Sequence, residues 1–426
     1  MRRVVVTGVG VVSPVGLGKE AFWQNLLAGQ CGLRTIDLFD PGGFGCHLGG
    51  QVPDYKINDF VPKTYRKATK VMARDIELAV IAADDAMKDA GLATKAYGES
   101  GITPERFGCN IGAGLISAEL NELTAAMHHA RSGNDLDLKA WGSEGINHLT
   151  PLWLLKYLPN MLACHVTIIH GLMGPSNTIT CADASGHLAV GEAYRTIQRN
   201  DADVAVCGGA ETKLNPMGMM RQNLLGRLNP DDNDAPERAV RPFADDATGT
   251  VLGEGGGLLV LEEYEHARAR GARVYCEIVG FGASQDVYSV TEPDPTGRSY
   301  AAAVTRALME AHVKPADVGG VVAHGLGIKA HDAAELAGLT TSFGEHLARI
   351  PVSLLKPQVG SLAAGDSISA AAAVLALHEG QMPPARNAGN GTLNTSNDTR
   401  PTNAETMLTT VYSLGGQNAA LLFRRV

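Results

Sequence analysis

Apolar runs alternate along the chain with segments of helical periodicity, and glycines mark the ends of many of them. Residues 3–12 form an almost unbroken β-branched run, which is typical of a strand buried on both faces of a sheet. Residues 70–91 place apolar side chains at helical spacing and predict a long amphipathic helix, while residues 20–29 predict a shorter one. The alternation predicts an α/β protein.

The same order of elements occurs twice in outline. In the first half, strand patterns occupy residues 107–114, 203–211 and 258–263. A second series then contains a strand, a helix, a strand, a helix, a glycine-rich segment with a helix, and closing strands (274–282, 300–311, 318–323, 332–339, 360–377). We therefore expect a duplicated α/β unit, with one half at residues 1–262 and the other at 263–426, rather than independent domains.

Two segments interrupt this order. Residues 115–150 are polar and irregular, and we expect them to leave the core as an excursion that carries short helices. Residues 226–256 are rich in Asp, Pro, Arg and Gly and predict a long loop region. Long loops in compact domains are often functional.

Residues 174–189 predict a sharp turn from a strand into a helix. Turn residues come first, a short β-branched segment follows, and a helical pattern begins after Asp183. The tip of such an elbow lies at a helix N-terminus, where unpaired N–H groups and the helix dipole favour an anion and lower the pKa of a thiol. Here the tip residue is Asp183, whose carboxylate is a much poorer nucleophile than a thiolate.

Composition and charge narrow the class of function. The chain has 426 residues and a net charge of −9, without the basic patches that nucleic acid or anionic lipid would require. Its apolar runs stay well short of the roughly 20 residues of a bilayer span. The seven cysteines lack metal-type spacing and are typical of reduced, mostly buried thiols. We expect a cytoplasmic protein without a metal site, whose partners are neither nucleic acid nor membrane.

The pair Gly8 and Gly10 at the end of the first strand suggests a dinucleotide-binding turn. The third glycine of that motif is missing, because residue 13 is Ser, and no helical pattern follows at once. A nucleotide site is therefore not favoured here.

The glycine-rich motifs, taken in order, resemble those of the β-ketoacyl-acyl carrier protein synthases, the elongating condensing enzymes of the thiolase superfamily. The resemblance covers almost the whole chain. It rests on Val6-Thr7-Gly8-Val9-Gly10, Gly174-Pro175-Ser176, Gly208-Gly209-Ala210-Glu211, Arg241-Pro242-Phe243, Gly253-Glu254-Gly255, Ala323-His324-Gly325, Lys356 with Gly360, and Gly415-Gly416-Gln417-Asn418. It implies a thiolase-like duplicated fold with five layers, αβαβα.

The resemblance also assigns a role to the elbow. Members of the family use a Cys there to carry the acyl chain as a thioester, because a thiolate is the nucleophile that acyl transfer needs. Counting forward from Gly174 and backward from Gly186 places Asp183 at the Cys position. Cys181 would fit only with compensating shifts on both sides, and we interpret it as a core thiol.

Two family histidines bind the malonyl thioester carbonyl and promote decarboxylation. The first matches His324, whereas Ser361 stands at the position of the second, five residues after the family lysine, Lys356. The acid that follows on the next family helix is replaced by Ala370. The resemblance thus implies that one donor to the developing enolate charge is missing.

Further differences lie at the C-terminus and in the histidines that no motif uses. The aromatic gate of the family, Gly-Phe-Gly-Gly, becomes Ser413-Leu414-Gly415-Gly416. We assign a packing role to His187 on the elbow helix and expect His331 to be exposed.

The leading hypothesis is a subunit that resembles a chain length factor and lacks the nucleophilic Cys. It would pair with a Cys-bearing ketosynthase, or with itself, in fatty acid or polyketide biosynthesis. Acyl carrier protein would bind through the partner, and the phosphopantetheine arm would be carried substrate, so we expect no cofactor. Trp153 lies in the segment that reaches towards the partner in this family, where it could cap the acyl tunnel or simply fill an interface.

Two alternatives remain open. The chain could be a malonyl-acyl carrier protein decarboxylase or an acyltransferase that uses His324 with Asp183 in place of Cys. An anionic Asp183 would repel a malonyl carboxylate by about 1 to 4 kcal/mol at ~4 Å, depending on the effective dielectric. The chain could also be an otherwise active synthase in which Asp183 replaces the Cys, by nature or by design.

Overall fold

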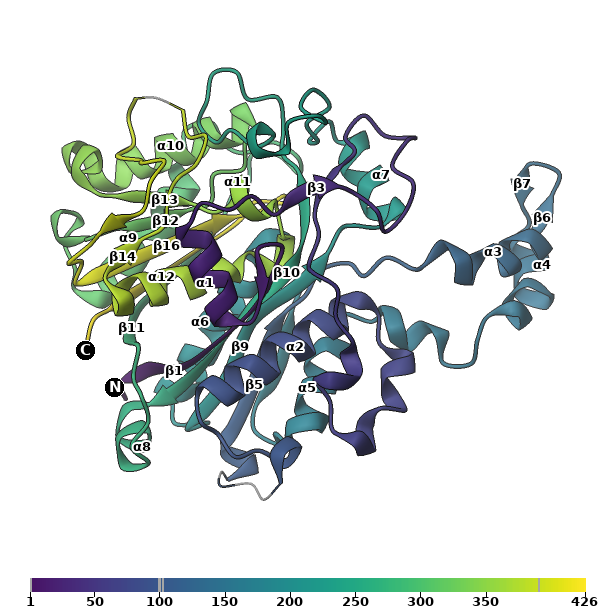
Figure 1. Ribbon diagram of the computed structural model, residues 1–426, viewed down its shortest axis with the longest axis horizontal. Helices are drawn as coiled ribbons and strands as arrows, with labels where there is room; N and C mark the ends of the chain where they lie inside the picture. The colour runs from purple at the N-terminus through teal and green to yellow at the C-terminus, as the bar shows by residue number, and fades with distance from the viewer. Residues whose placement is uncertain (1, 99–100, 102, 390) are drawn as a thin grey trace.

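The strands of the N-terminal half lie in the spatial order β8, β5, β9, β10, β1 in the computed structural model, which describes residues 2–98, 101, 103–389 and 391–426 (Figure 1). Their bounds are β1 (Val4–Ser13), β5 (Phe107–Gly112), β8 (Ser176–Ile179), β9 (Val204–Thr212) and β10 (Leu252–Glu263). Strands β8, β5 and β9 are parallel, and β10 is antiparallel to both β9 and β1.

The strands of the C-terminal half repeat this arrangement in the order β13, β12, β16, β17, β11. Their bounds are β11 (Cys276–Gln285), β12 (Val321–Ala323), β13 (Val352–Leu354), β16 (Thr406–Tyr412) and β17 (Gln417–Arg424). Chain order and strand directions match those of the first half strand by strand. The expected duplication is confirmed, and the two sets join where β1 pairs antiparallel with β11. The boundary at residues 262 and 263 stays a prediction.

Helices cover both strand sets and also separate them. On the outer face of the first set lie α2 (Arg74–Asp89) and α5 (Met161–His170), and on that of the second lie α9 (Arg298–Ala311) and, packed on α9, α10 (Lys329–Phe343). Between the sets lie α6 (Ser185–Gln198) and α12 (Ile368–Glu379), each in contact with strands of both halves. The result is the five-layered α/β architecture that we expected.

The remaining elements are short and surround these layers. The helices are α1 (Lys19–Leu27), α3 (Leu120–His129), α4 (Leu138–Ser143), α7 (Pro216–Leu224), α8 (Tyr264–Ala269) and α11 (Lys356–Val359). The strands are β2 (Gly16–Leu17), β3 (Leu33–Thr35), β4 (Leu48–Gly50), β6 (Arg131–Ser132), β7 (Asp135–Leu136), β14 (Gln381–Met382) and β15 (Arg400–Pro401). No helix within the described parts of the chain is long and apolar enough to span a bilayer.

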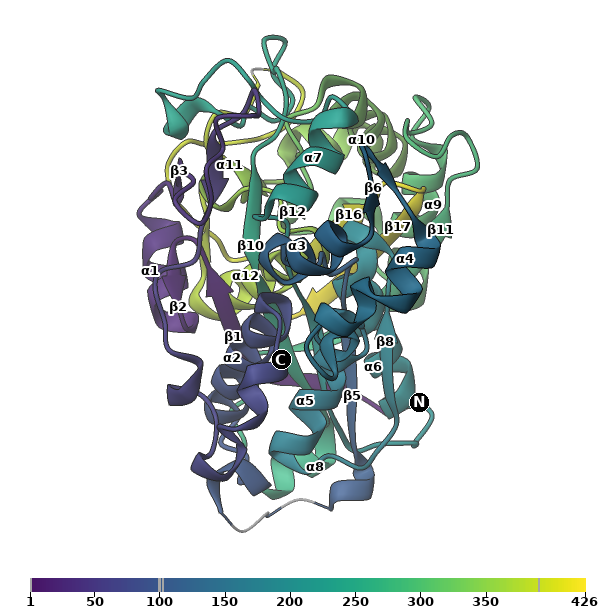
Figure 2. The same ribbon diagram turned by 90° about the vertical axis from the view of Figure 1, so that its right-hand side faces the viewer.

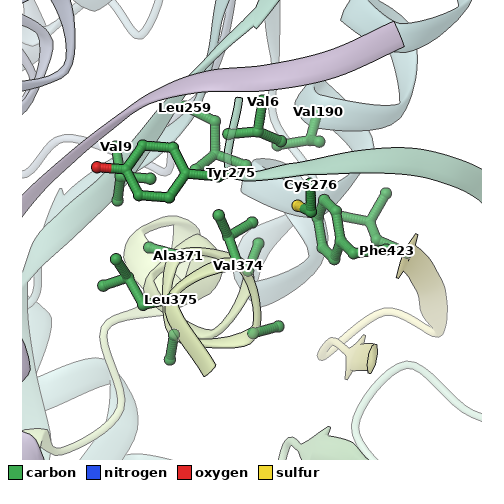
Figure 3. Packing of buried hydrophobic residues seen from close by; sticks show 14 of the residues in the cluster. Val6, Val9, Val190, Leu259, Tyr275, Cys276, Ala371, Val374, Leu375 and Phe423 are labelled. Carbon is green, nitrogen blue, oxygen red and sulfur yellow. The ribbon is translucent and has the colours of Figure 1, made fainter. Parts of the chain in front are cut away.

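The central helix α12 shows why the core sits between the sheets. All of its residues from 368 to 377 are buried, as expected for a helix with apolar side chains all round that packs on both sides. Figure 3 shows its side chains against strands of both halves (Ala371, Val374 and Leu375 of α12; Val6, Val9, Leu259 and Phe423 of the strands). This layer therefore holds the two halves together.

Residues 115–150 form the expected excursion. They carry α3, β6, β7 and α4 and project from the body as an arm, on the right in Figure 1 and towards the viewer in Figure 2. Exposed apolar side chains follow this arm (Leu120, Met127, Leu136, Leu138, Ile146). Hydrophobic side chains that the chain's own core does not cover indicate a surface for a partner.

One predicted boundary is wrong. We expected a loop to continue to residue 256 and the next strand to begin at 258, whereas β10 already begins at Leu252. The glycines in this strand admit the backbone of another segment, since a Cβ on Gly253 would lie 2.4 Å from the carbonyl oxygen of Val359. A strand that contains many glycines because another backbone packs closely against it has a composition that resembles that of a loop.

Gly8 and Gly10 also serve packing, because β1 passes directly over α2. A Cβ on Gly10 would lie 2.0 Å from the carbonyl oxygen of Ala82, so no side chain fits there without a backbone shift. We expect Gly10→Ala to lower the free energy of unfolding by about 3 kcal/mol, as measured by urea unfolding. The control Gly43→Ala adds a methyl group with no heavy atom within 4 Å and should change stability by less than about 0.5 kcal/mol. Equal stability of the two variants would contradict the packing argument.

Candidate active site

The predicted elbow is present between β8 and α6. A short 3-10 turn at Ala182–Ala184 links them, and Ala182 has a φ of 47°, a left-handed conformation that is uncommon for a residue with a side chain. The Ser185 hydroxyl accepts a hydrogen bond from the Cys181 N–H and donates one to the Ala182 carbonyl, both at 2.7 Å. This strained turn places Asp183, which is only 4% exposed, at the start of the helix.

Asp183 lies next to Ser361, which stands at the position that the resemblance assigns to the second histidine. Its Oδ1 lies 3.4 Å from the Ser361 hydroxyl, at the outer limit of a hydrogen bond. Ser361 follows Gly360, which has a φ of 77°, and its N–H donates to the Val251 carbonyl at 2.8 Å. The left-handed glycine turns the chain after α11 and brings Ser361 into the site.

Lys356, His324 and Asp366 form a buried group beside these two residues. The Lys356 ammonium lies 2.9 Å from Asp366 Oδ2, an ion pair, and 3.2 Å from His324 Nδ1. The ligand atoms of Asp183, His324 and Asp366 all lie within 4.8 Å of one another. The structure therefore brings together the predicted residues Asp183, Ser361, His324 and Lys356, which come from segments far apart in the sequence.

His324 is neutral. Burial lowers its pKa well below the usual range, and the nearby charges of Lys356 and Arg227 lower it further. Because the ammonium of Lys356 can only donate to Nδ1, the ring proton belongs on Nε2. Nε2 is buried and has no hydrogen-bond partner among the described residues, so it can donate to a bound carbonyl.

The residue that the sequence interpretation missed is Asp366. We expected the acid of the following helix to be lost at Ala370, and Ala370 is indeed buried in the core. Asp366 lies four residues earlier, in the 3-10 turn that precedes α12, and supplies a carboxylate to Lys356. Burial raises its pKa to about 6, against the lowering effect of Lys356, and the nearby Asp183 raises it too.

Two acids hold the loop that carries His324. Glu335 accepts hydrogen bonds from the N–H groups of His324 and Gly325, both at 2.8 Å. Asp332 accepts one from the N–H of Leu326, also at 2.8 Å, and burial raises its pKa to about 7. Both carboxylates accept hydrogen bonds from the backbone of this loop, so they position the loop that carries His324.

The predictions for the other two histidines, His187 and His331, have different outcomes. His187 is buried and its Nε2 lies 3.1 Å from the Thr409 hydroxyl, which supports the packing role that we predicted. The expectation that His331 is exposed is wrong, since its ring is buried and stacked on Tyr412 with centroids 5.5 Å apart. Tyr412 also contacts the His324 ring, at 4.9 Å, so this aromatic group forms one wall of the site.

A pocket of about 550 Å³ opens from Asp183 and Ser361. Leucines form much of its lining, and Leu414 of the predicted gate is among them. Gly415 and Gly416 lie beyond it and line a smaller depression that also contains His331 and Tyr412. The segment that replaces the aromatic gate therefore does face the site.

Trp153 lies outside this pocket. Its ring packs on Tyr157, with centroids 5.3 Å apart, and against the core at the base of the arm. Whether it reaches the pocket of a second subunit stays a prediction. Cys181 is half-buried at the end of β8, and burial raises the pKa of its thiol, which opposes a nucleophilic role.

Comparison with known proteins decides the family. The profile of the beta-ketoacyl synthase N-terminal domain matches residues 1–267, and that of the C-terminal domain matches residues 275–389. The chain belongs to the beta-ketoacyl synthase family. It is 35% identical to 3-oxoacyl-[acyl-carrier-protein] synthase 2 of Vibrio cholerae serotype O1, over 100% of this chain and 99% of that protein.

Solved structures of this family are similar over the full length. One is the ishigamide ketosynthase/chain length factor, with a TM-score of 0.85, 29% identity and coverage of 100% of this chain and 99% of the other. Another is a type II polyketide synthase acyl-carrier protein in complex with its ketosynthase, with a TM-score of 0.84, 26% identity and the same coverage. The condensing-enzyme fold and its link to fatty acid or polyketide synthesis are thus established for this beta-ketoacyl synthase homologue.

The buried group at Lys356 gives a test of the site's electrostatics. In Lys356→Met the Asp366 carboxylate loses its counterion, and we expect the free energy of unfolding to fall by about 3–5 kcal/mol at pH 8. The folded-state pKa of Asp366, already raised to about 6, then rises further above its unfolded value. A group whose pKa is raised in the folded state stabilises it at low pH and ceases to do so as the pH rises. The destabilisation caused by Lys356→Met should therefore be smaller at pH 5 than at pH 8.

Urea unfolding at the two pH values measures this difference. The double variant Lys356→Met/Asp366→Asn is the control, since it removes both charges and should recover most of the stability without the pH dependence. A loss for Lys356→Met that is the same at pH 5 and pH 8 would refute the pairing of these two groups.

Proposed function

We propose that this chain is a partner subunit of a beta-ketoacyl synthase, similar to a chain length factor, and that it carries no acyl thioester itself. The observation that supports this most is the carboxylate of Asp183 at the tip of the elbow, where the family resemblance places the nucleophilic Cys. Ser361 and the group of Lys356, His324 and Asp366 lie around it. A retained site without its thiol fits a role in shape and assembly.

The chemistry of the tip argues against acyl transfer by this chain. A carboxylate is a much weaker nucleophile than a thiolate. An acyl group on it would be a reactive anhydride rather than a thioester. The nearest thiol in sequence, Cys181, has a raised pKa and does not line the pocket. Both points support the inference that the partner, rather than this chain, carries the acyl group.

Features of the surface support a partner of the same architecture. Strand β8 is the edge of the sheet, with β5 as its one pairing partner among the described strands, and an edge strand can pair with a strand of another chain. Near it, Ile168 of α5 and Met173 are exposed large apolar side chains. Together with the apolar arm at residues 115–150, they form a surface that a second thiolase-like chain could cover.

The identity of the partner is the finer part of the proposal. The ishigamide ketosynthase/chain length factor is a pair of such chains, and this chain shares its fold and 29% of its sequence. We infer that the partner here is a Cys-bearing ketosynthase and that acyl carrier protein docks mainly through it. A homodimer is the alternative arrangement. The phosphopantetheine arm would enter as part of the carrier protein, so no resident cofactor is proposed.

Trp153 has a specific place in this arrangement. It packs against the core and against Tyr157 at the base of the arm. Its indole Nε1 is buried without a hydrogen-bond partner among the described residues. We propose that the indole closes the acyl tunnel of the synthase and limits chain length by volume.

Co-expression tests the proposal directly. The chain is purified alone and together with a Cys-bearing ketosynthase from the same source, and each sample is given acyl- and malonyl-acyl carrier protein. We expect a stable complex that condenses, while the chain alone forms no β-ketoacyl product. Condensation by the lone chain, or its failure to bind any such synthase, would overturn the subunit role.

The tunnel role of Trp153 has its own test. In the complex, Trp153→Ala removes the bulk of the indole, and we expect the product distribution to shift to longer chains, as measured by mass spectrometry. Trp23→Ala is the control, because Trp23 packs against the core of the body far from the arm. An unchanged product distribution in a complex that still assembles would exclude the tunnel role.

One observation favours a second function. The unpartnered Nε2 of the neutral, buried His324 is a ready donor to a thioester carbonyl, which would help decarboxylation of a malonyl group. Release of CO₂ from malonyl-acyl carrier protein by the purified chain, lost in His324→Ala, would support this decarboxylase function instead. The repulsion between Asp183 and the malonyl carboxylate makes it the weaker candidate.

A further inference from the structure

The pocket beside Asp183 is lined by several positively charged side chains. Lys213, Arg221 and Arg227 all line it, and Asp183 is the one carboxylate in its described lining. Lys213 is paired with Glu211, which lies just behind it. The two arginines have no carboxylate partner within 4 Å among the described residues.

Arg227 is the unusual member of this set. It is only 8% exposed, its Nε has no hydrogen-bond partner among the described residues, and its Nη1 donates to the side chain of Gln222 at 2.9 Å. A buried guanidinium without a counterion is costly, so an anion that completes its hydrogen bonds would be bound favourably. The charge of Arg227 also reaches the site, since it lowers the pKa of both His324 and His331.

The remainder of the lining is apolar. Five leucines line the pocket together with the arginines, and three of them, Leu115, Leu224 and Leu225, are also exposed to solvent (the others are Leu252 and Leu414). Arg221 stands on α7 beside them, and its Nη1 donates to the Ser117 hydroxyl at 2.9 Å. A cavity of about 550 Å³ with apolar walls and a fixed guanidinium suits a small molecule with one anionic end and one hydrocarbon end.

We propose that this pocket binds a medium-chain carboxylic acid as a non-covalent ligand, with its carboxylate on Arg227 and its chain along the leucines. A guanidinium matches a carboxylate with two parallel N–H donors, a geometry that a neutral hydroxyl cannot use. Arg221 adds a second positive charge at the same cavity. The inference concerns the cavity of this chain alone and does not depend on the proposed partner role.

Calorimetry on the purified full-length chain tests the inference with three probes: octanoate, octan-1-ol and inorganic phosphate. We expect saturable binding of octanoate, binding of octan-1-ol at least tenfold weaker, and no saturable binding of phosphate over the same concentration range. Octan-1-ol or phosphate binding as tightly as octanoate, or octanoate failing to bind, would overturn it. These comparisons use the unaltered chain, so they hold whatever a variant does to folding.

Variants then locate the carboxylate. Arg227→Gln should weaken octanoate binding at least tenfold and leave octan-1-ol binding unchanged, and Arg221→Gln should have a smaller effect of the same kind. The matched control is Arg268→Gln, an exposed arginine of α8 that pairs with Glu265 away from the pocket. Octanoate affinity that is unchanged in both Arg227→Gln and Arg221→Gln would place the carboxylate elsewhere and refute the assignment.

Discussion

The backbone of residues 363–368 lies directly against glycines of the other half of the molecule, and the site depends on this close approach. A Cβ on Gly209 of β9 would lie 2.2 Å from the carbonyl oxygen of Ala364, and one on Gly186 of α6 would lie 2.7 Å from the same oxygen. On β10, a Cβ on Gly257 would lie 2.7 Å from Cα of Ile368. The glycines thus let the segment that carries Asp366 sit against the elbow that carries Asp183.

This constraint explains why the chain has glycines at these positions. A different side chain at the elbow would leave this backbone packing unchanged, whereas a side chain at Gly209 would separate two layers of the fold. The buried group around Lys356 has the same dependence. It holds an ammonium, a carboxylate and a neutral imidazole out of water, which is stable only while each group stays within reach of the next.

Much of the architecture followed from sequence patterns, because buried strands and amphipathic helices have distinct periods. The helix expected at residues 70–91 is α2, and the turn at Asp183 is where the strand and helix patterns placed it. The failures have physical reasons. The start of β10 was missed because its glycines resemble a loop, and Asp366 because it reaches Lys356 from the 3-10 turn that precedes α12, ahead of the expected acid.

Two residues of the site could not have been found from spacing alone. His331 lies on a helix whose pattern does not show that its ring stacks on Tyr412, a residue distant in sequence. Arg227 lies in a segment rich in polar residues, where an arginine is ordinarily exposed, and only the folded chain shows that its Nε is buried. Burial of a charged group depends on tertiary packing, so the sequence carries no local signal for it.

The proposed subunit role requires that the elbow of this chain never carries an acyl group. Intact-mass measurement of both subunits, after the complex is incubated with acyl-acyl carrier protein, tests it most directly. We expect the mass of the Cys-bearing partner to increase by one acyl group while the mass of this chain stays unchanged. An acyl adduct on this chain, at Asp183 or at Cys181, would contradict it.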